Sequence, residues 1–267
     1  MHVIIPAAGF GTRLGELTID TPKGLLLVNE KPVLDYIFQK IEGLQKTVDI
    51  TAVYIVTNNK FCGSFKSWLL GYRQKNYSNE ELSRQLCERI EILSDGTNSN
   101  DDRLGQVGDI YFALNKEKKV DDDVLLLTSD NLFTFDLSEV YKFAMNKKCI
   151  TNVIYDVKDK ESAKKSGVVL LNKEDLIKEF EEKPNEPKSS LASTGISVFP
   201  KSMLYVIRQY HNEYTEKEKQ NLDKMGYLFT RLVNDGVKVY GFRCKDEDKW
   251  LDIGTPECLK VAEELFR

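Results

Sequence analysis

The chain has 267 residues, of which 41% are hydrophobic and 30% are charged, a balance typical of globular proteins that excludes a disordered or fibrous chain. Its 38 Lys and Arg residues against 42 Asp and Glu residues give a net charge of −4, which argues against non-specific nucleic-acid binding. No apolar run approaches the roughly 20 residues of a membrane helix, the first residues show no signal-peptide pattern, and no C-x-x-C pair occurs. We therefore expect a reduced, cytoplasmic protein with no membrane partner.

In the first half of the chain, short apolar runs alternate with helical patterns, which predicts parallel βαβ units. The predicted strands cover residues 3–6, 52–57, 90–93 and 124–129, and the predicted helices lie near 32–44, 64–74, 80–88 and 105–116. The first strand runs directly into a glycine-rich loop.

The second half of the chain is less regular. Predicted strands cover residues 150–156, 167–171, 176–182, 193–199 and 237–242, and predicted helices cover 201–211, 226–233 and 256–266. Several strands in succession indicate a β-rich lobe inserted into the alternating pattern. The sequence therefore predicts an α/β fold with a mixed sheet, flanked by helices and carrying this lobe.

The glycine loop at residues 7–14 (AAGFGTRL) is the strongest local signal. Glycines let the backbone approach a ligand closely, and successive N–H groups can hold phosphate oxygens. Arg13 lies in the loop and Lys23 follows, so two cations stand near this cradle, which suits a polyphosphate. A dinucleotide-binding loop is the specific alternative, but Gly15 falls one place late for its third glycine. A Walker A motif is absent, and an ordinary glycine-rich turn between a strand and a helix remains an alternative interpretation.

Two carboxylates stand at predicted strand ends, far apart in the sequence. Asp130 follows strand 124–129, and Asp252 lies in the segment 250–256 (WLDIGTP). Such a pair can hold Mg²⁺ together with substrate phosphates, but a turn residue and a helix cap are the structural alternatives. Lys183, beside Glu182, is either a loop charge or a phosphate ligand.

These segments carry a resemblance to a known family. The sequence resembles the sugar-phosphate nucleotidylyltransferases, and most of all their short form related to glucose-1-phosphate thymidylyl- and uridylyltransferases. The matching motifs occur in family order at residues 7–14 with 21–23, 127–131, 182–184, 194–196 and 250–256. They span nearly the whole chain.

The resemblance implies a Rossmann-like, mostly parallel central sheet with an inserted β-rich sugar-binding lobe. It implies a single domain over 1–267, with a nucleotide-binding half near 1–135 and an acceptor-binding half with the last helix at 136–267. The implied reaction joins an NTP, with a pyrimidine base favoured, to a sugar 1-phosphate or a similar phosphorylated acceptor, giving NDP-sugar and pyrophosphate with Mg²⁺. Relatives often form dimers or tetramers, so a homo-oligomer is also compatible.

The resemblance also assigns roles to individual residues. Arg13 and Lys23 would be catalytic, and Asp130 and Asp252 would bind Mg²⁺. The nucleotide-binding residues would be Ala8, Gly9, Gly11, Thr12, Arg13 and Gly108, and the acceptor-binding residues would be Gly167, Glu182, Lys183 and Gly195.

Two departures from the family pattern leave the substrates open. The polar loop 94–103 stands where the family usually reads the base with Gln and Pro, so thymine, uracil and cytosine all remain. Ser166 precedes Gly167 where a tyrosine is common, which leaves room for another sugar phosphate or a non-sugar acceptor of a cytidylyltransferase.

Two other classes of function compete with this reading. A non-catalytic nucleotide or sugar-phosphate sensor can use the same fold. A nucleotide-sugar-dependent glycosyltransferase would need a D-x-D metal motif. Residues 121–123 have that spacing, but they precede a strand instead of following one, which favours a solvated run of surface charges.

Overall fold

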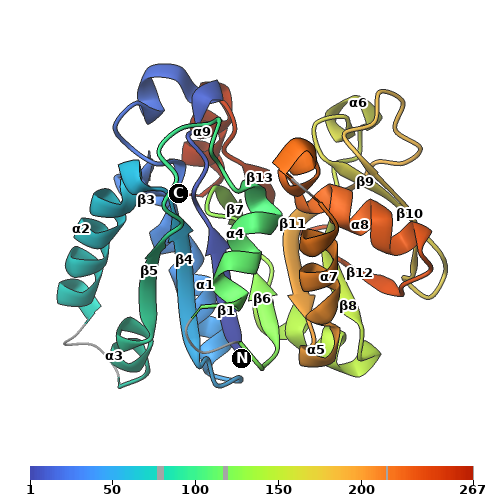
Figure 1. Cartoon of the computed structure of the whole chain (residues 1–267), viewed down its shortest axis with the longest axis horizontal. Coiled ribbons are helices and arrows are strands. Elements are labelled where there is room, and N and C mark those ends of the chain that lie inside the picture. The colour runs from blue at the N-terminus through green and yellow to red at the C-terminus, as the bar shows by residue number, and fades with distance from the viewer. Residues whose placement is uncertain (77–80, 117–119, 215, 267) are drawn as a thin grey trace.

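The structure is a computed structural model that describes residues 1–76, 81–116, 120–214 and 216–266, apart from the side chains of residues 13, 216 and 217. In these residues one nine-stranded sheet runs through the molecule, in the order β10-β9-β11-β6-β1-β4-β5, with β8 beside β11 and β12 beside β8 (Figure 1). Its strands are β1 His2–Pro6, β4 Ala52–Thr57, β5 Ile90–Ser94, β6 Val124–Leu126, β8 Ile150–Asp156, β9 Gly167–Leu171, β10 Ile177–Glu182, β11 Leu191–Phe199 and β12 Val239–Arg243.

The centre of this sheet is parallel. Strand β1 lies between β6 and β4, and β5 follows β4, all in the same direction. These strands are continuous apolar runs because helices cover both faces of the sheet. The confirmed fold class is therefore mixed α/β with a mostly parallel centre flanked by helices.

Strand β11 joins this parallel part to the antiparallel lobe. Its end pairs with β6, and its start pairs with β9. Its register against β8 shifts between Ser193 and Ser197. Gly195 lies in this irregular stretch with φ +79°, and a Cβ there would stand 2.9 Å from Cγ2 of Thr128, so glycine lets β11 bend close to the end of β6.

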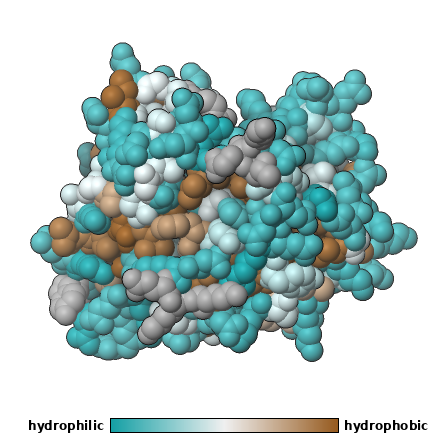
Figure 2. Space-filling model, viewed as in Figure 1, coloured by the Kyte–Doolittle hydropathy of each residue, from teal (hydrophilic) through white to brown (hydrophobic). Residues whose placement is uncertain are grey.

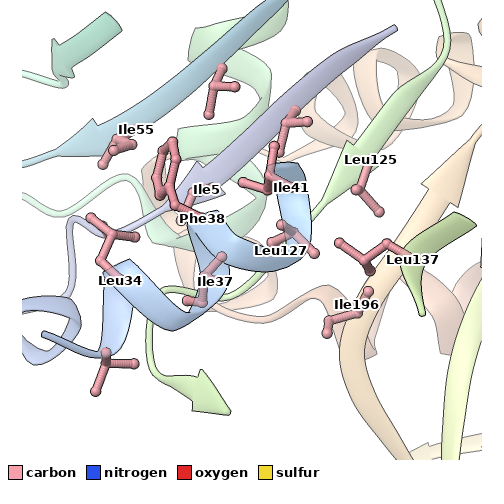
Figure 3. Close-up of a cluster of buried hydrophobic side chains, with 14 of the residues drawn as sticks. Ile5, Leu34, Ile37, Phe38, Ile41, Ile55, Leu125, Leu127, Leu137 and Ile196 are labelled. Atoms are coloured by element: carbon pink, nitrogen blue, oxygen red, sulfur yellow. The ribbon is translucent and has the colours of Figure 1, made fainter. Parts of the chain in front are cut away.

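Two hydrophobic clusters fill the two faces of the sheet. Alternate residues of β1 divide between them, with Ile5 in one and Ile4 in the other. Figure 3 shows Leu34, Ile37, Phe38 and Ile41 of one helix packed against Ile5, Ile55 and Leu125 of three strands. The helices are α1 Val33–Gln45, α2 Asn59–Asn76, α3 Glu81–Glu88, α4 Gly105–Leu114, α5 Leu137–Lys147, α6 Lys160–Ala163, α7 Tyr205–Glu213, α8 Met225–Asn234 and α9 Pro256–Leu265, with short 3-10 helices at Thr12–Thr18, Lys23–Leu25, Lys201–Met203 and Glu216–Leu222.

Several elements were not expected from the sequence. Two three-residue strands, β7 (Asn131–Phe133) and β13 (Trp250–Asp252), pair with each other outside the main sheet, and β2 (Leu27–Val28) pairs with β3 (Lys31–Pro32). Strand β6 ends at Leu126, short of the predicted residue 129. Helix α5 was also missed, although Asp136 caps it by accepting a hydrogen bond from Ser138 N.

The outer surface is mainly hydrophilic. In Figure 2 polar side chains cover most of the visible face, and apolar ones gather on its left, over the region of α2, β4 and β5 in Figure 1. Among the described residues, no helix combines the length and the apolar character needed to cross a bilayer.

Candidate functional site

A cavity of about 680 Å³ opens beside the carboxyl ends of β1 and β6 and reaches into the β-rich lobe. Ligands of open α/β sheets usually bind at this edge. Eleven of the residues selected from the sequence border it: Ala8, Gly9, Gly11, Thr12, Lys23, Asp130, Gly167, Glu182, Lys183, Gly195 and Asp252. Gly108 is a buried residue of α4 that does not reach the cavity wall, and the side chain of Arg13 lies outside the described part of the chain.

The glycine loop is fixed to the sheet at its start. Ala7 N donates to the carbonyl of Val56 at 2.7 Å, and the buried amide of Asn58 donates to the carbonyl of Ala8 at 2.8 Å. Asn58 in turn accepts from Phe61 N at 2.9 Å. The loop is therefore held in place before any ligand arrives, which lowers the entropy cost of binding.

Two glycines of the loop are needed for different reasons. Gly11 has φ +69°, and a Cβ there would stand 2.8 Å from Cβ of Thr18, whose hydroxyl donates to the carbonyl of Gly11 at 2.7 Å. Gly9 is exposed, and no atom lies within 4 Å of the position of its absent Cβ. Gly11 thus shapes the loop, while Gly9 leaves the open side of the loop free for a ligand.

Lys23 and Asp130 form an ion pair on the cavity wall. Lys23 Nζ lies 3.0 Å from Asp130 Oδ2, and the two side chains are 15% and 21% exposed. The other oxygen of Asp130 accepts from Asn131 Nδ2 at 3.1 Å, and Asn131 Oδ1 accepts from Trp250 Nε1. Contacts within the protein therefore hold both charges in place on the cavity wall.

The pairing of β7 with β13 brings the two predicted metal ligands together. Asp252 lies opposite Asn131 in this ladder, and Ile253 N donates to the carbonyl of Asp130 at 2.9 Å. Asp130, which directly precedes β7, and Asp252, the last residue of β13, therefore border one cavity. Among the described residues no group of three His, Cys, Asp or Glu could hold a metal. Two carboxylates fit Mg²⁺, which takes its remaining ligands from water and phosphate.

The far end of the cavity is lined by the β-rich lobe. Gly167 packs against the ring of Phe180, where a Cβ would stand 2.6 Å from Cζ. Glu182 is 10% exposed and pairs with Lys224 at 3.3 Å. Lys183 takes φ +48°, and its N–H donates to Ser166 O at 3.1 Å. This end offers both an acidic group and basic groups to a polar ligand.

Four lining residues were missed by the sequence analysis. Gly226 lies against Glu182 so closely that a Cβ there would overlap the carboxylate. Arg103 makes a two-pronged contact with Asp223, at 3.1 and 2.7 Å, between the polar loop and the second half of the chain. Asp109 is a buried acid in the apolar helix α4. Only Asp109 had a local signal, as an acid within an apolar run.

Comparison with known proteins identifies the family of the chain. The chain matches the Nucleotidyl transferase family over residues 2–266. It belongs to that family. The resemblance to sugar-phosphate nucleotidylyltransferases and the expected enzyme class are thereby confirmed.

Individual relatives match along most of this family member. It is 30% identical over 259 residues to the bifunctional protein GlmU of Methanocaldococcus jannaschii, covering 96% of this chain but 52% of GlmU. The chain thus spans about half the length of that relative. It is 26% identical to the UTP–glucose-1-phosphate uridylyltransferase AglF of Haloferax volcanii, covering 100% of this chain and 97% of AglF.

The fold is shared with solved structures. A UDP-glucose pyrophosphorylase in complex with UDP-glucose superposes with a TM-score of 0.76 at 20% identity, covering 99% of this chain and 97% of that protein. This likeness concerns the fold.

Proposed function

We propose that the protein transfers a nucleotidyl group from an NTP, with a pyrimidine base favoured, to a sugar 1-phosphate or a similar phosphorylated acceptor, in a Mg²⁺-dependent reaction that releases pyrophosphate. The observation that carries this is the single cavity bordered by the glycine loop, the Lys23–Asp130 pair and Asp252. The name of AglF, of which 97% is covered by the match, supports a sugar 1-phosphate as the acceptor.

In this proposal one phosphate oxygen of the acceptor attacks the α-phosphorus of the NTP, and the bond to the pyrophosphate oxygen breaks. The attacking oxygen is already anionic at neutral pH, so no general base is needed. The two histidines, His2 and His211, do not border the cavity, in agreement with this chemistry. Catalysis then rests on positioning and on charge.

Most of the roles follow from position on the cavity wall, and that of Arg13 follows from the family resemblance. The backbone of Gly9, Gly11 and Thr12 holds the triphosphate, and Lys23 and Arg13 offset the charge that grows at the phosphorus. Asp130 and Asp252 would hold Mg²⁺, which when bound neutralises phosphate charge and aligns the reacting groups.

The two parts of the chain divide the substrates. We propose that residues 1–135 bind the nucleotide and that residues 136–267 bind the acceptor, through Gly167, Glu182, Lys183 and Gly195. Both parts build one continuous sheet, so the substrates meet where β11 joins β6.

The experiment is pyrophosphate release with Mg²⁺ over a panel of NTPs and phosphorylated acceptors. We expect turnover for a single pair of substrates, and a loss of about 10²-fold or more in both Lys23→Ala and Asp130→Asn with unchanged melting temperatures. Full activity in both variants would overturn the assignment. Nucleotide binding by calorimetry with no pyrophosphate from any pair would instead indicate a sensor.

A further inference from the structure

Helix α8 begins at the wall of the cavity without a capping side chain of its own. Its N-cap residue is Lys224, whose ammonium group cannot accept a hydrogen bond, and its first turn carries no acidic residue. The first N–H groups of a helix have no partner within the helix and need an acceptor from elsewhere. Met225, the first residue of α8, finds that acceptor in the side chain of Gln106, whose Oε1 lies 3.1 Å from Met225 N.

Gln106 belongs to the other half of the chain. It is the second residue of α4 and borders the same cavity. Its own N–H donates to the carbonyl of Asp223 at 3.4 Å, so the backbone and the side chain of Gln106 both hold the segment before α8. Gly105 makes this approach possible, because it has φ +77° and a Cβ there would stand 2.6 Å from the carbonyl oxygen of Leu222. The first turn of α4 therefore lies directly against the chain that leads into α8.

The two residues that flank Met225 both contact Glu182. Lys224 Nζ lies 3.3 Å from Glu182 Oε1. On the other side, a Cβ at Gly226 would stand 2.7 Å from the carboxyl carbon of Glu182, so glycine leaves the space that the carboxylate occupies. The side chain of Glu182 is enclosed by these contacts, and a shift of the first turn of α8 would therefore move its carboxylate.

Lys224 cannot position Glu182 by itself. Its side chain is 37% exposed, and an ion pair with a long, solvated lysine holds its geometry only weakly. The hydrogen bond from Met225 N to Gln106 is directional, and its loss leaves a part-buried donor without its acceptor. The orientation of the first turn of α8, with Lys224 and Gly226 on it, is therefore set at Gln106.

We infer that Gln106 is a positioning residue for the acceptor: it holds the first turn of α8 and, through Lys224 and Gly226, the carboxylate of Glu182. This inference rests on the proposed role of Glu182 in acceptor binding. It gives a residue of the nucleotide half an effect on the other substrate. A change at Gln106 should therefore weaken the binding of the acceptor part of a ligand and spare the nucleotide part.

The test is calorimetric binding of UDP-glucose, which carries both parts of the proposed product, and of UDP, which lacks the sugar. In Gln106→Met the side chain keeps its length and loses its oxygen. We expect this variant to bind UDP-glucose about 5-fold or more weakly than wild type, and UDP within about 2-fold of wild type. Gln106→Glu keeps an accepting oxygen on a side chain of equal length and should retain the wild-type ratio of the two affinities.

Asp136→Ala is the matched control for a loss of stability. It removes a hydrogen-bonded helix cap from α5, and Asp136 does not border the cavity. This variant should lower the melting temperature, as Gln106→Met does, and leave the ratio of the two affinities unchanged.

The outcomes separate the inference from the proposed function. Equal binding of UDP-glucose and UDP by wild type overturns the inference, as does a Gln106→Met variant that weakens neither ligand or both alike. A Gln106→Glu variant that behaves like Gln106→Met, or a changed ratio in Asp136→Ala, also overturns it. The expected ratios without pyrophosphate release from any pair of substrates support the positioning role while the transfer reaction fails.

Discussion

Two residues of the glycine loop differ in what they are expected to do, one in folding and the other in ligand binding. Gly11 has a left-handed backbone and no room for a Cβ beside Thr18, whereas Gly9 has open space. We expect Gly11→Ala to lower the free energy of unfolding by about 1–3 kcal/mol. Gly9→Ala should leave stability within about 0.5 kcal/mol but weaken NTP binding, because its methyl group occupies the ligand side. Urea unfolding and calorimetry check both; equal stability of the two variants would contradict this.

Burial raises the pKa of Asp109 well above its usual value, which gives a pH dependence of stability with a definite sign. Below its ordinary pKa of 3.8 the carboxyl is protonated in both the folded and the unfolded chain. As the pH rises above 3.8 the unfolded chain loses this proton while the folded chain keeps it, so this group lowers stability progressively until the raised folded pKa is passed. Asp109→Asn cannot titrate. Its stability relative to wild type should therefore increase from pH 4 upward, measured by urea unfolding, and a constant difference would argue against a raised pKa.

At the scale of elements, the short β7–β13 ladder carries one side-chain hydrogen bond, from the indole of Trp250, that holds a residue beside Asp130. Trp250 Nε1 donates to Asn131, which is 4% exposed and itself holds Asp130. We expect Trp250→Phe to cost about 1–3 kcal/mol, because the buried amide loses its donor. It should also raise the Mg²⁺ concentration needed for half-maximal rate.

The second tryptophan of the chain provides a matched control for this prediction. Trp68 Nε1 donates to Asp35 at 2.7 Å, and neither residue borders the cavity. Trp68→Phe should lower stability to a similar degree and leave the Mg²⁺ dependence unchanged. An equal shift of the Mg²⁺ dependence in both variants would mean that general destabilisation, and not the β7–β13 contact, is responsible.

At the scale of the whole molecule, the Arg103–Asp223 pair connects the polar loop of the first half to the second half at the cavity wall. The two side chains are 44% and 25% exposed, so the pair should contribute about 1 kcal/mol or less to stability. The Asp223→Ala variant should therefore have a melting temperature close to that of wild type. Its KM values for both substrates should rise, because the ion pair no longer connects the two sides of the cavity. Steady-state kinetics check this, and unchanged KM values would show that the pair is a surface contact only.

Elements that depend on local sequence patterns were predicted, whereas elements that depend on contacts between distant segments were missed. Strands 52–57, 150–156 and 167–171 were predicted with their observed bounds, because each is a local apolar run. The strands β7 and β13 were missed, since three residues carry no periodicity and pair only across the fold. The glycine loop and the two carboxylates were found as sequence motifs. The raised pKa of Asp109 could not be predicted in this way, because it depends on burial and on a tertiary contact with Asp95.

The ladder between β7 and β13 also bears on how the protein is made. Asp130 is synthesised 122 positions before Asp252, and Ile253 N ties the backbone of Asp130 into place only when both segments are present. A nascent chain that stops short of residue 253 lacks this contact and cannot complete the pair of carboxylates. In the proposed role of these two carboxylates as Mg²⁺ ligands, the cation site is therefore the part of the cavity that translation completes last.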